Sequence, residues 1–191
     1  GLRAAGIGSD DNGNGQLDEC DSCPIDPYRL LYTSAPSDAR IGQAVDLSGD
    51  LAVLGAPYDS TAGTEAGAAF IMSKATGTWR LQQKLVPTGE AAGGRFGADV
   101  ALDGDVLVVG ASLANDAGTD AGAAYVFRYT GSEWVQEAAL HADDAYDNDL
   151  FGKCVAISGE RIVIGAFRQD AAGTDAGAVY VYEWDGAGWP Q

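Results

Sequence analysis

The stretch AGTDAGAAYVF at 117–127 decides the fold, because close copies of it return at a fixed distance on both sides. AGTEAGAAFIM lies 55 residues earlier, at 62–72, and AGTDAGAVYVY lies 55 residues later, at 172–182. Three other landmarks keep this spacing: Ile41-Gly42, Phe96-Gly97 and Phe151-Gly152; Gly55-Ala56, Gly110-Ala111 and Gly165-Ala166; and Trp79, Trp134 and Trp189. A period this strict predicts three copies of one supersecondary unit, each presenting its apolar face to its neighbours in the same way.

Each copy contains the pattern of four antiparallel strands. In VALDGDVLVVGA, at 100–111, two apolar runs flank Asp103-Gly104, which is a strong signal for a two-residue hairpin. AAYVF at 123–127 and WVQEAAL at 134–140 supply a third and a fourth strand, and the polar HADDAYDND then crosses to the next Phe-Gly. Four strands followed by a crossing are the plan of a β-propeller blade. We therefore expect an all-β domain over 28–191, with blades at about 41–85, 96–140 and 151–191.

The two ends of the repeat region do not balance. The third copy reaches only Trp189, Pro190 and Gln191, so we expect its outermost strand to be missing. An outer strand without a blade precedes the first copy, made of Tyr28, Arg29, Leu30, Leu31, Tyr32 and Thr33. Three blades are fewer than the usual four to eight. The hypothesis we favour is that strand 28–33 of one molecule completes the third blade of the next by strand addition, which yields a ring or a fibre. The alternative is that the chain is a piece of a longer propeller.

The segment 1–27 contains a candidate calcium loop in SDDNGNGQLDECDSCP. It follows the pattern D-x-[DN]-x-[DN]-G, which supplies the hard oxygen ligands that Ca²⁺ prefers. The predicted ligands are Asp10, Asn12, Asn14, the backbone carbonyl of Gln16, Asp18 and Asp21. Asp21 stands where a bidentate Glu is usual, and its shorter side chain would weaken or reshape the site. The alternative is a turn rich in Asn, Gly and Asp that holds no ion.

Three cysteines are too few for a disulfide framework. Cys20 and Cys23 form one CxxC, which suits a small disulfide loop or half of a zinc site. Zinc needs about four ligands, and the chain adds only Cys154 and the single His141, so we favour the disulfide. We expect Cys154 to be a small strand residue.

Composition and side-chain chemistry exclude several functions. The net charge of −17 repels nucleic acid and anionic membranes, and no apolar run is long enough to span a bilayer, so we expect a soluble chain with no membrane insertion. No nucleophile lies beside a base, so we expect no enzyme and a surface role for His141. Glu65, Asp120 and Asp175 are expected to hold the Gly-Thr turns rather than ions, and the three tryptophans to pack between blades.

The succession FG, V-A-L/I-S/D-G, V-V-G-A and A-G-A-A-Y-V-F resembles the FG-GAP repeat, which builds the propellers of integrin alpha-subunit heads and of many secreted bacterial proteins. The resemblance covers 28–191 and implies an extracellular, non-enzymatic, structural or adhesive role. We expect copies of the chain itself as partners through strand addition, with an extracellular protein or a glycan as a further candidate. The integrin-type calcium loop between the first two strands is absent here. Segment 1–27 is similar to a thrombospondin type 3 repeat at Cys20, Asp21, Cys23 and Pro24, which implies a calcium-loaded extracellular linker.

Overall fold

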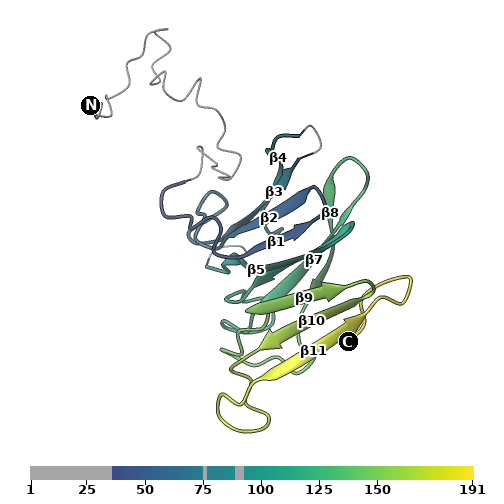
Figure 1. Ribbon diagram of the computed structural model, residues 1–191. Coiled ribbons are helices and arrows are strands. Elements are labelled where there is room, and N and C mark those ends of the chain that lie inside the picture. The colour runs from purple at the N-terminus through teal and green to yellow at the C-terminus, as the bar shows by residue number, and fades with distance from the viewer. Residues whose placement is uncertain (1–35, 75–76, 89–92) are drawn as a thin grey trace, which may run out of the picture. The chain divides into compact units, whose positions relative to one another are not determined.

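The computed structural model describes residues 36–74, 77–88 and 93–191, which lie in one compact unit spanning Ser34–Gln191 (Figure 1). These residues form eleven β-strands and no helix, which confirms the all-β prediction. No helix that could cross a membrane is found in this part of the chain. The calcium loop, the CxxC cysteines and the strand predicted at 28–33 lie outside the described residues.

The strands form three antiparallel sheets that follow one another in chain order, and we call them blades 1, 2 and 3. Blade 1 contains β1 (Val45–Ser48), β2 (Leu51–Ala56), β3 (Ala68–Ser73) and β4 (Arg80–Leu85). Blade 2 contains β5 (Phe96–Asp103), β6 (Val106–Ala111), β7 (Ala123–Tyr129) and β8 (Trp134–Leu140). Blade 3 contains β9 (Cys154–Ser158), β10 (Arg161–Ala166) and β11 (Ala178–Glu183). The sheets of four, four and three strands confirm the three repeats and the strand predicted to be missing from the third.

The first hairpin of each blade turns one residue later than the sequence pattern indicated. The two residues between the strands are Gly104 and Asp105 in blade 2, rather than Asp103 and Gly104. Gly104 has a φ of 59°, and the matching Gly49 and Gly159 have φ values of 58° and 56°. A glycine with positive φ at the first central position is typical of a type II′ turn, whose twist suits the flanking strands.

Alternation along the strands gives every blade two apolar faces. We call the face that packs on the preceding blade the front face, and the face that packs on the following blade the rear face. In blade 2, Leu107 and Tyr125 belong to the core shared with blade 1, whereas Val108 and Val126 belong to the core shared with blade 3. Neighbouring strand residues thus point to opposite cores, as the period of two requires.

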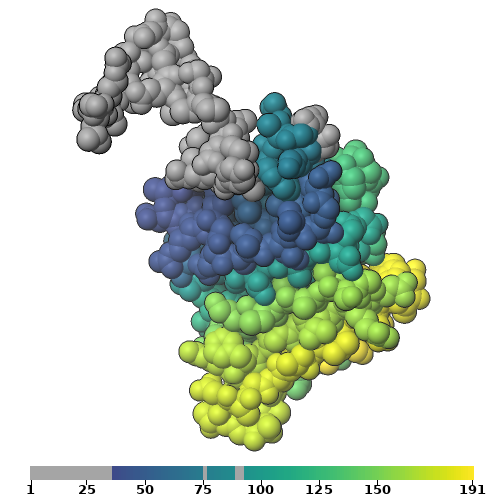
Figure 2. All heavy atoms as spheres, in the orientation of Figure 1, coloured from purple at the N-terminus to yellow at the C-terminus, as the bar shows by residue number. Residues whose placement is uncertain are grey.

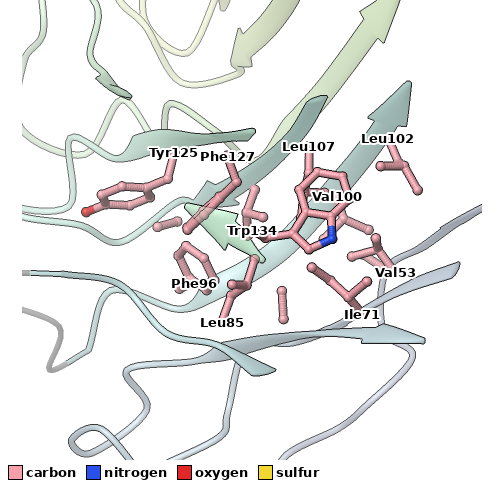
Figure 3. Packing of buried hydrophobic residues seen from close by; sticks show 14 of the residues in the cluster. Val53, Ile71, Leu85, Phe96, Val100, Leu102, Leu107, Tyr125, Phe127 and Trp134 are labelled. Atoms are coloured by element: carbon pink, nitrogen blue, oxygen red, sulfur yellow. The ribbon is translucent and has the colours of Figure 1, made fainter. Parts of the chain in front are cut away.

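The core between blades 1 and 2 combines side chains from both sheets (Figure 3). Val53, Ile71 and Leu85 extend from the rear face of blade 1, and Phe96 and Trp134 meet them from blade 2. Trp134 is 2% exposed, which confirms its predicted packing between blades. The side-chain amide of Gln83 reinforces this contact: its Oε1 accepts from the backbone N–H of Trp134 at 2.8 Å, and its Nε2 donates to the backbone carbonyl of Trp134 at 2.9 Å.

The repeated glycines allow the backbones of successive blades to approach closely. A Cβ on Gly55 would overlap the carbonyl oxygen of Gly97, and one on Gly110 would overlap the carbonyl oxygen of Gly152. The Phe-Gly turn of each later blade therefore rests directly on the second strand of the blade before it. Phe96 and Phe151, which precede these turn glycines, are fully buried.

Gly110→Ala is expected to destabilise the fold by about 1–3 kcal/mol, because the new methyl group must displace the backbone of blade 3. The control is Gly165→Ala at the equivalent position of blade 3, where the nearest atom to the added Cβ is the Cβ of Cys154 at 3.6 Å. That control should change the free energy of unfolding by less than about 0.5 kcal/mol. Urea unfolding of the two variants checks this, and equal losses would contradict the role given to close approach.

Candidate functional site

Blade 3 has an open outer edge. In blade 2, β8 pairs with β7 from Tyr129↔Trp134 to Ala124↔Leu140, whereas β11 is paired with β10 alone among the strands of the described residues. The Glu183 N–H donates to the carbonyl of Pro190 at 3.1 Å, in the register that Arg128 and Val135 have in blade 2. The chain therefore enters the position of a fourth strand at one end only.

The open edge presents main-chain groups in a regular row. Residues of an antiparallel strand turn their N–H and C=O alternately to the two sides. Because Glu183 bonds outward to Pro190, Val181 and Val179 also direct their N–H and C=O away from β10. An edge of this kind accepts another strand by main-chain hydrogen bonds. The strand-addition hypothesis places strand 28–33 of another copy at this position.

In the loops between the second and third strands of each blade, the residues expected to hold the turns with their side chains do so with their backbone N–H groups. We expected the side chains of Glu65, Asp120 and Asp175 to hold the turns. Instead their N–H groups donate to the side chains five residues earlier, Ser60, Asn115 and Asp170, at 3.0, 2.8 and 2.7 Å. The three donors have φ values of 47°, 52° and 51°, a left-handed conformation that a side-chain cap stabilises. The Glu65 carboxylate pairs with Arg95 at 3.1 Å.

Asp59 is a buried carboxylate in the loop between β2 and β3. It is fully buried, accepts from the Thr61 N–H at 2.9 Å and pairs with Lys84 Nζ at 2.8 Å. Burial acts to raise the pKa of Asp59, but the hydrogen bonds from Lys84 and Thr61 and the charge of Lys84 outweigh burial, so the pKa lies below 3.8. Gln169 has this position in blade 3, where its Oε1 accepts from the Ala171 N–H at 2.8 Å.

A cleft of about 730 Å³ lies beside the crossing from blade 2 to blade 3. Its lining residues are Ala117, Asp144, Ala145, Tyr146, Asp147, Gln169, Asp170 and Ala171. The acids already have protein partners: Asp144 accepts from the Tyr180 hydroxyl at 2.7 Å, and Asp147 accepts from the Thr119 N–H at 2.8 Å. Burial and the neighbouring Asp144 raise the pKa of Tyr180, so its hydroxyl stays a donor. Tyr146 is 73% exposed at the cleft.

The described residues contain no group of three metal-ligating side chains. His141 has a side chain that is 29% exposed, and its Nε2 lies 3.6 Å from Asp116 Oδ2, which is longer than a hydrogen bond. The site predictions for Asp10, Asn12, Asn14, Gln16, Asp18 and Asp21, and for Cys20 and Cys23, fall outside the described ranges and stay predictions.

Asp59→Asn is expected to lower stability near neutral pH by about 2 kcal/mol, somewhat less than the 3–5 kcal/mol for breaking a fully buried pair, because Lys84 is partly exposed. The folded-state pKa is lowered, so the stabilisation is complete above the unfolded pKa and disappears as the pH falls through the folded pKa. The difference in unfolding free energy between the unaltered chain and the Asp59→Asn variant should therefore become smaller below about pH 4. Urea unfolding at a series of pH values measures this difference. The control is Glu65→Gln, which removes the exposed ion pair with Arg95 and should lower the free energy of unfolding by less than about 1 kcal/mol.

No curated protein matches the chain. The sequence model of the FG-GAP repeat matches residues 34–72, 79–127 and 134–182, which together make up more than half of the chain. Members of this family are generally non-enzymatic and typically occur in extracellular or surface proteins. Each match ends on the third strand of a blade, and the second and third matches begin at the fourth strand of the blade before, β4 and β8. The chain belongs to the FG-GAP repeat family and has the blades of a propeller-type ligand-binding or structural module.

Proposed function

We propose that this protein is a non-enzymatic extracellular structural protein whose copies assemble head to tail, strand 28–33 of one copy completing blade 3 of the next. The observation that carries the proposal is the open edge of β11 in a blade whose two predecessors have a fourth strand. Val179 and Val181 direct main-chain N–H and C=O groups toward the position of the absent fourth strand. Main-chain groups of this kind can bind an added strand of many different sequences.

The donor strand has the character of an outer strand. Tyr28 to Thr33 is a run of aromatic, aliphatic and β-branched residues interrupted by Arg29, and it precedes blade 1 as β4 precedes blade 2. Donation between copies joins unlike surfaces, so the assembly is a ring where the rotation closes and a fibre where it does not.

Leu31→Pro is expected to abolish assembly, because proline removes a ladder donor and fits poorly within a paired strand. Val181→Pro should do the same from the acceptor side, since the N–H that it removes faces the vacant position and not β10. The assembled mass is measured by light scattering over a range of protein concentrations. Leu2→Pro, outside the donor strand, is the control and should assemble as the unaltered chain does. A monomer in the unaltered chain at every concentration would overturn the proposal.

We propose that the N-terminal loop binds calcium. The oxygen atoms at the spacing of a calcium loop come from Asp10, Asn12, Asn14, Gln16, Asp18 and Asp21. Residues 22–27 connect this loop to the donor strand. We infer that Ca²⁺ orders the segment from which strand 28–33 is presented.

The full chain is expected to bind one Ca²⁺ at this loop, and Asp10→Asn with Asp18→Asn should abolish the binding because two charged ligands are lost. Isothermal titration with Ca²⁺ measures this. Asp26→Asn, which removes a charge outside the loop, should bind as before. Unchanged binding in the double variant would exclude the loop as the calcium site.

A calcium-dependent adhesion module within a larger propeller is the second candidate, and the cleft at Asp144 and Tyr146 favours it. An exposed aromatic ring beside acidic and amide groups suits a glycan or a basic protein segment. The two functions differ in what a single copy does: an adhesion module captures its ligand as a monomer, whereas a structural protein forms large assemblies with no added partner.

A further inference from the structure

The two end blades expose apolar positions that are buried inside the array. On the rear faces of blades 1 and 2 these positions are fully buried, whereas in blade 3 they are 38%, 67% and 46% exposed. The residues concerned are Val53, Ala69 and Ile71 in blade 1, Val108, Ala124 and Val126 in blade 2, and Val163, Val179 and Val181 in blade 3. Figure 2 places the green-to-yellow surface of blade 3 at the opposite end of the array from the purple-to-blue surface of blade 1.

The front face of blade 1 is the counterpart of this exposed rear face. Val100 and Leu102 of β5 are 5% and 6% exposed where they pack against blade 1. Val45 and Leu47 have the same positions in blade 1 and are 63% and 62% exposed. The β1 part of the front face is therefore exposed, whereas Ala52, Phe70 and Met72 on the same face are 6%, 0% and 5% exposed.

The glycines at the two ends show the same complementarity. Gly55 and Gly110 receive the Phe-Gly turn of the following blade, while the in-register Gly165 has only Cys154 within 4 Å of an added Cβ. Gly97 and Gly152 press on the preceding blade, while the in-register Gly42, with a φ of 87°, has nothing within 4 Å. Blade 3 thus has an open backbone position at Gly165 on which a Phe-Gly-type turn can pack, and blade 1 has such a turn at Ile41-Gly42.

A polar contact between hairpins repeats as well. Ser48 Oγ accepts from the Gly104 N–H at 3.4 Å, and Asp103 Oδ2 accepts from the Gly159 N–H at 2.7 Å. The next pair in this series would join the Ser158 hydroxyl of blade 3 to the Gly49 N–H of a following blade 1. The Ser158 hydroxyl and the Gly49 N–H therefore keep the same register as the apolar residues and the glycines at the two ends.

We propose that the rear face of blade 3 binds the front face of blade 1 of a second copy, with Ile41-Gly42 seated on Gly165 as Phe96-Gly97 is seated on Gly55. This inference deepens the proposed assembly and rests on it, and it adds a face contact to the strand contact. The two are compatible, because strand 28–33 precedes blade 1 in the chain and would reach the open edge of the same blade 3. Two copies supply six blades, within the four to eight of closed propellers.

Charge sets the conditions under which this contact forms. Each copy carries −17, so long-range repulsion opposes association, and added salt screens it. The contacting faces themselves are dominated by valine and leucine, whose burial is not weakened by salt. Association should therefore strengthen as the ionic strength rises.

The test is sedimentation of the full chain with Gly165→Ala on the rear face and Leu47→Asp on the front face. Gly165→Ala adds one methyl group in open space in the single copy but overlaps the Ile41-Gly42 turn in the assembly, so it should weaken association about tenfold or more. The melting temperature of the dissociated chain, measured at a concentration too low for assembly, should be unchanged. Leu47→Asp places a charge in the same contact from the other side. Gly188→Ala, where an added Cβ meets nothing within 4 Å, is the control and should associate normally.

Mixing the two variants gives the decisive result. Neither variant has an intact contact on its own, but the Leu47→Asp rear face and the Gly165→Ala front face are both unaltered, so the mixture should form a heterodimer. Assemblies in the unaltered chain that Gly165→Ala and Leu47→Asp leave intact would overturn the face contact. If Leu31→Pro still dissociates those assemblies, strand donation stands without it. A monomeric unaltered chain would overturn both.

Discussion

The contact between a Phe-Gly turn and the second strand of the preceding blade is the constraint on which the rest of the structure depends. It needs a glycine on each side, because the two backbones approach too closely for a Cβ on Gly55 or Gly110. With the backbones at that separation, the side chains of facing sheets interlock and leave Phe96 and Phe151 without solvent exposure. The glycines therefore allow the sheets to approach closely enough to form the cores between blades. The period is constant because each of these glycines must lie opposite the Phe-Gly turn of the next blade.

The blades are equivalent in backbone and unequal in side-chain chemistry. Position 59 shows this most clearly: blade 1 has a buried Asp59 paired with Lys84, blade 2 has Ala114, and blade 3 has Gln169. All three are compatible with the same turn, because the carboxylate and the amide accept the same backbone hydrogen bond and alanine leaves no polar atom to satisfy. Repeat architecture thus fixes where a residue lies, while the identity of the residue is free wherever hydrogen bonding remains satisfied.

The sequence predicted the features that repeat with the period and missed those that depend on the local backbone conformation or on comparing equivalent positions of the three blades. Strand order, the packing of Trp134 and the incomplete third blade all followed from a period of 55 and from apolar alternation. The hairpin centre at Gly104-Asp105 was misplaced by one residue, since Asp103-Gly104 is an equally good turn signal until φ is known. The reversed caps at Glu65, Asp120 and Asp175 could not be foreseen, because donor and acceptor are indistinguishable in a loop rich in both. The valines of blade 3 follow the apolar pattern of the repeat in the sequence. Their exposure is recognised as unusual only by comparison with the buried equivalent positions of blades 1 and 2.

An array in which each blade contacts only its neighbours behaves as a one-dimensional cooperative chain. Blade 2 is held on both faces, whereas blades 1 and 3 are each held on one, so local opening should start at the ends and its free energy should be highest in the middle. A blade that joins either end changes an outer unit into an inner one. Folding and association then draw on the same free energy, and the stability of such an array depends on the concentration of its own copies.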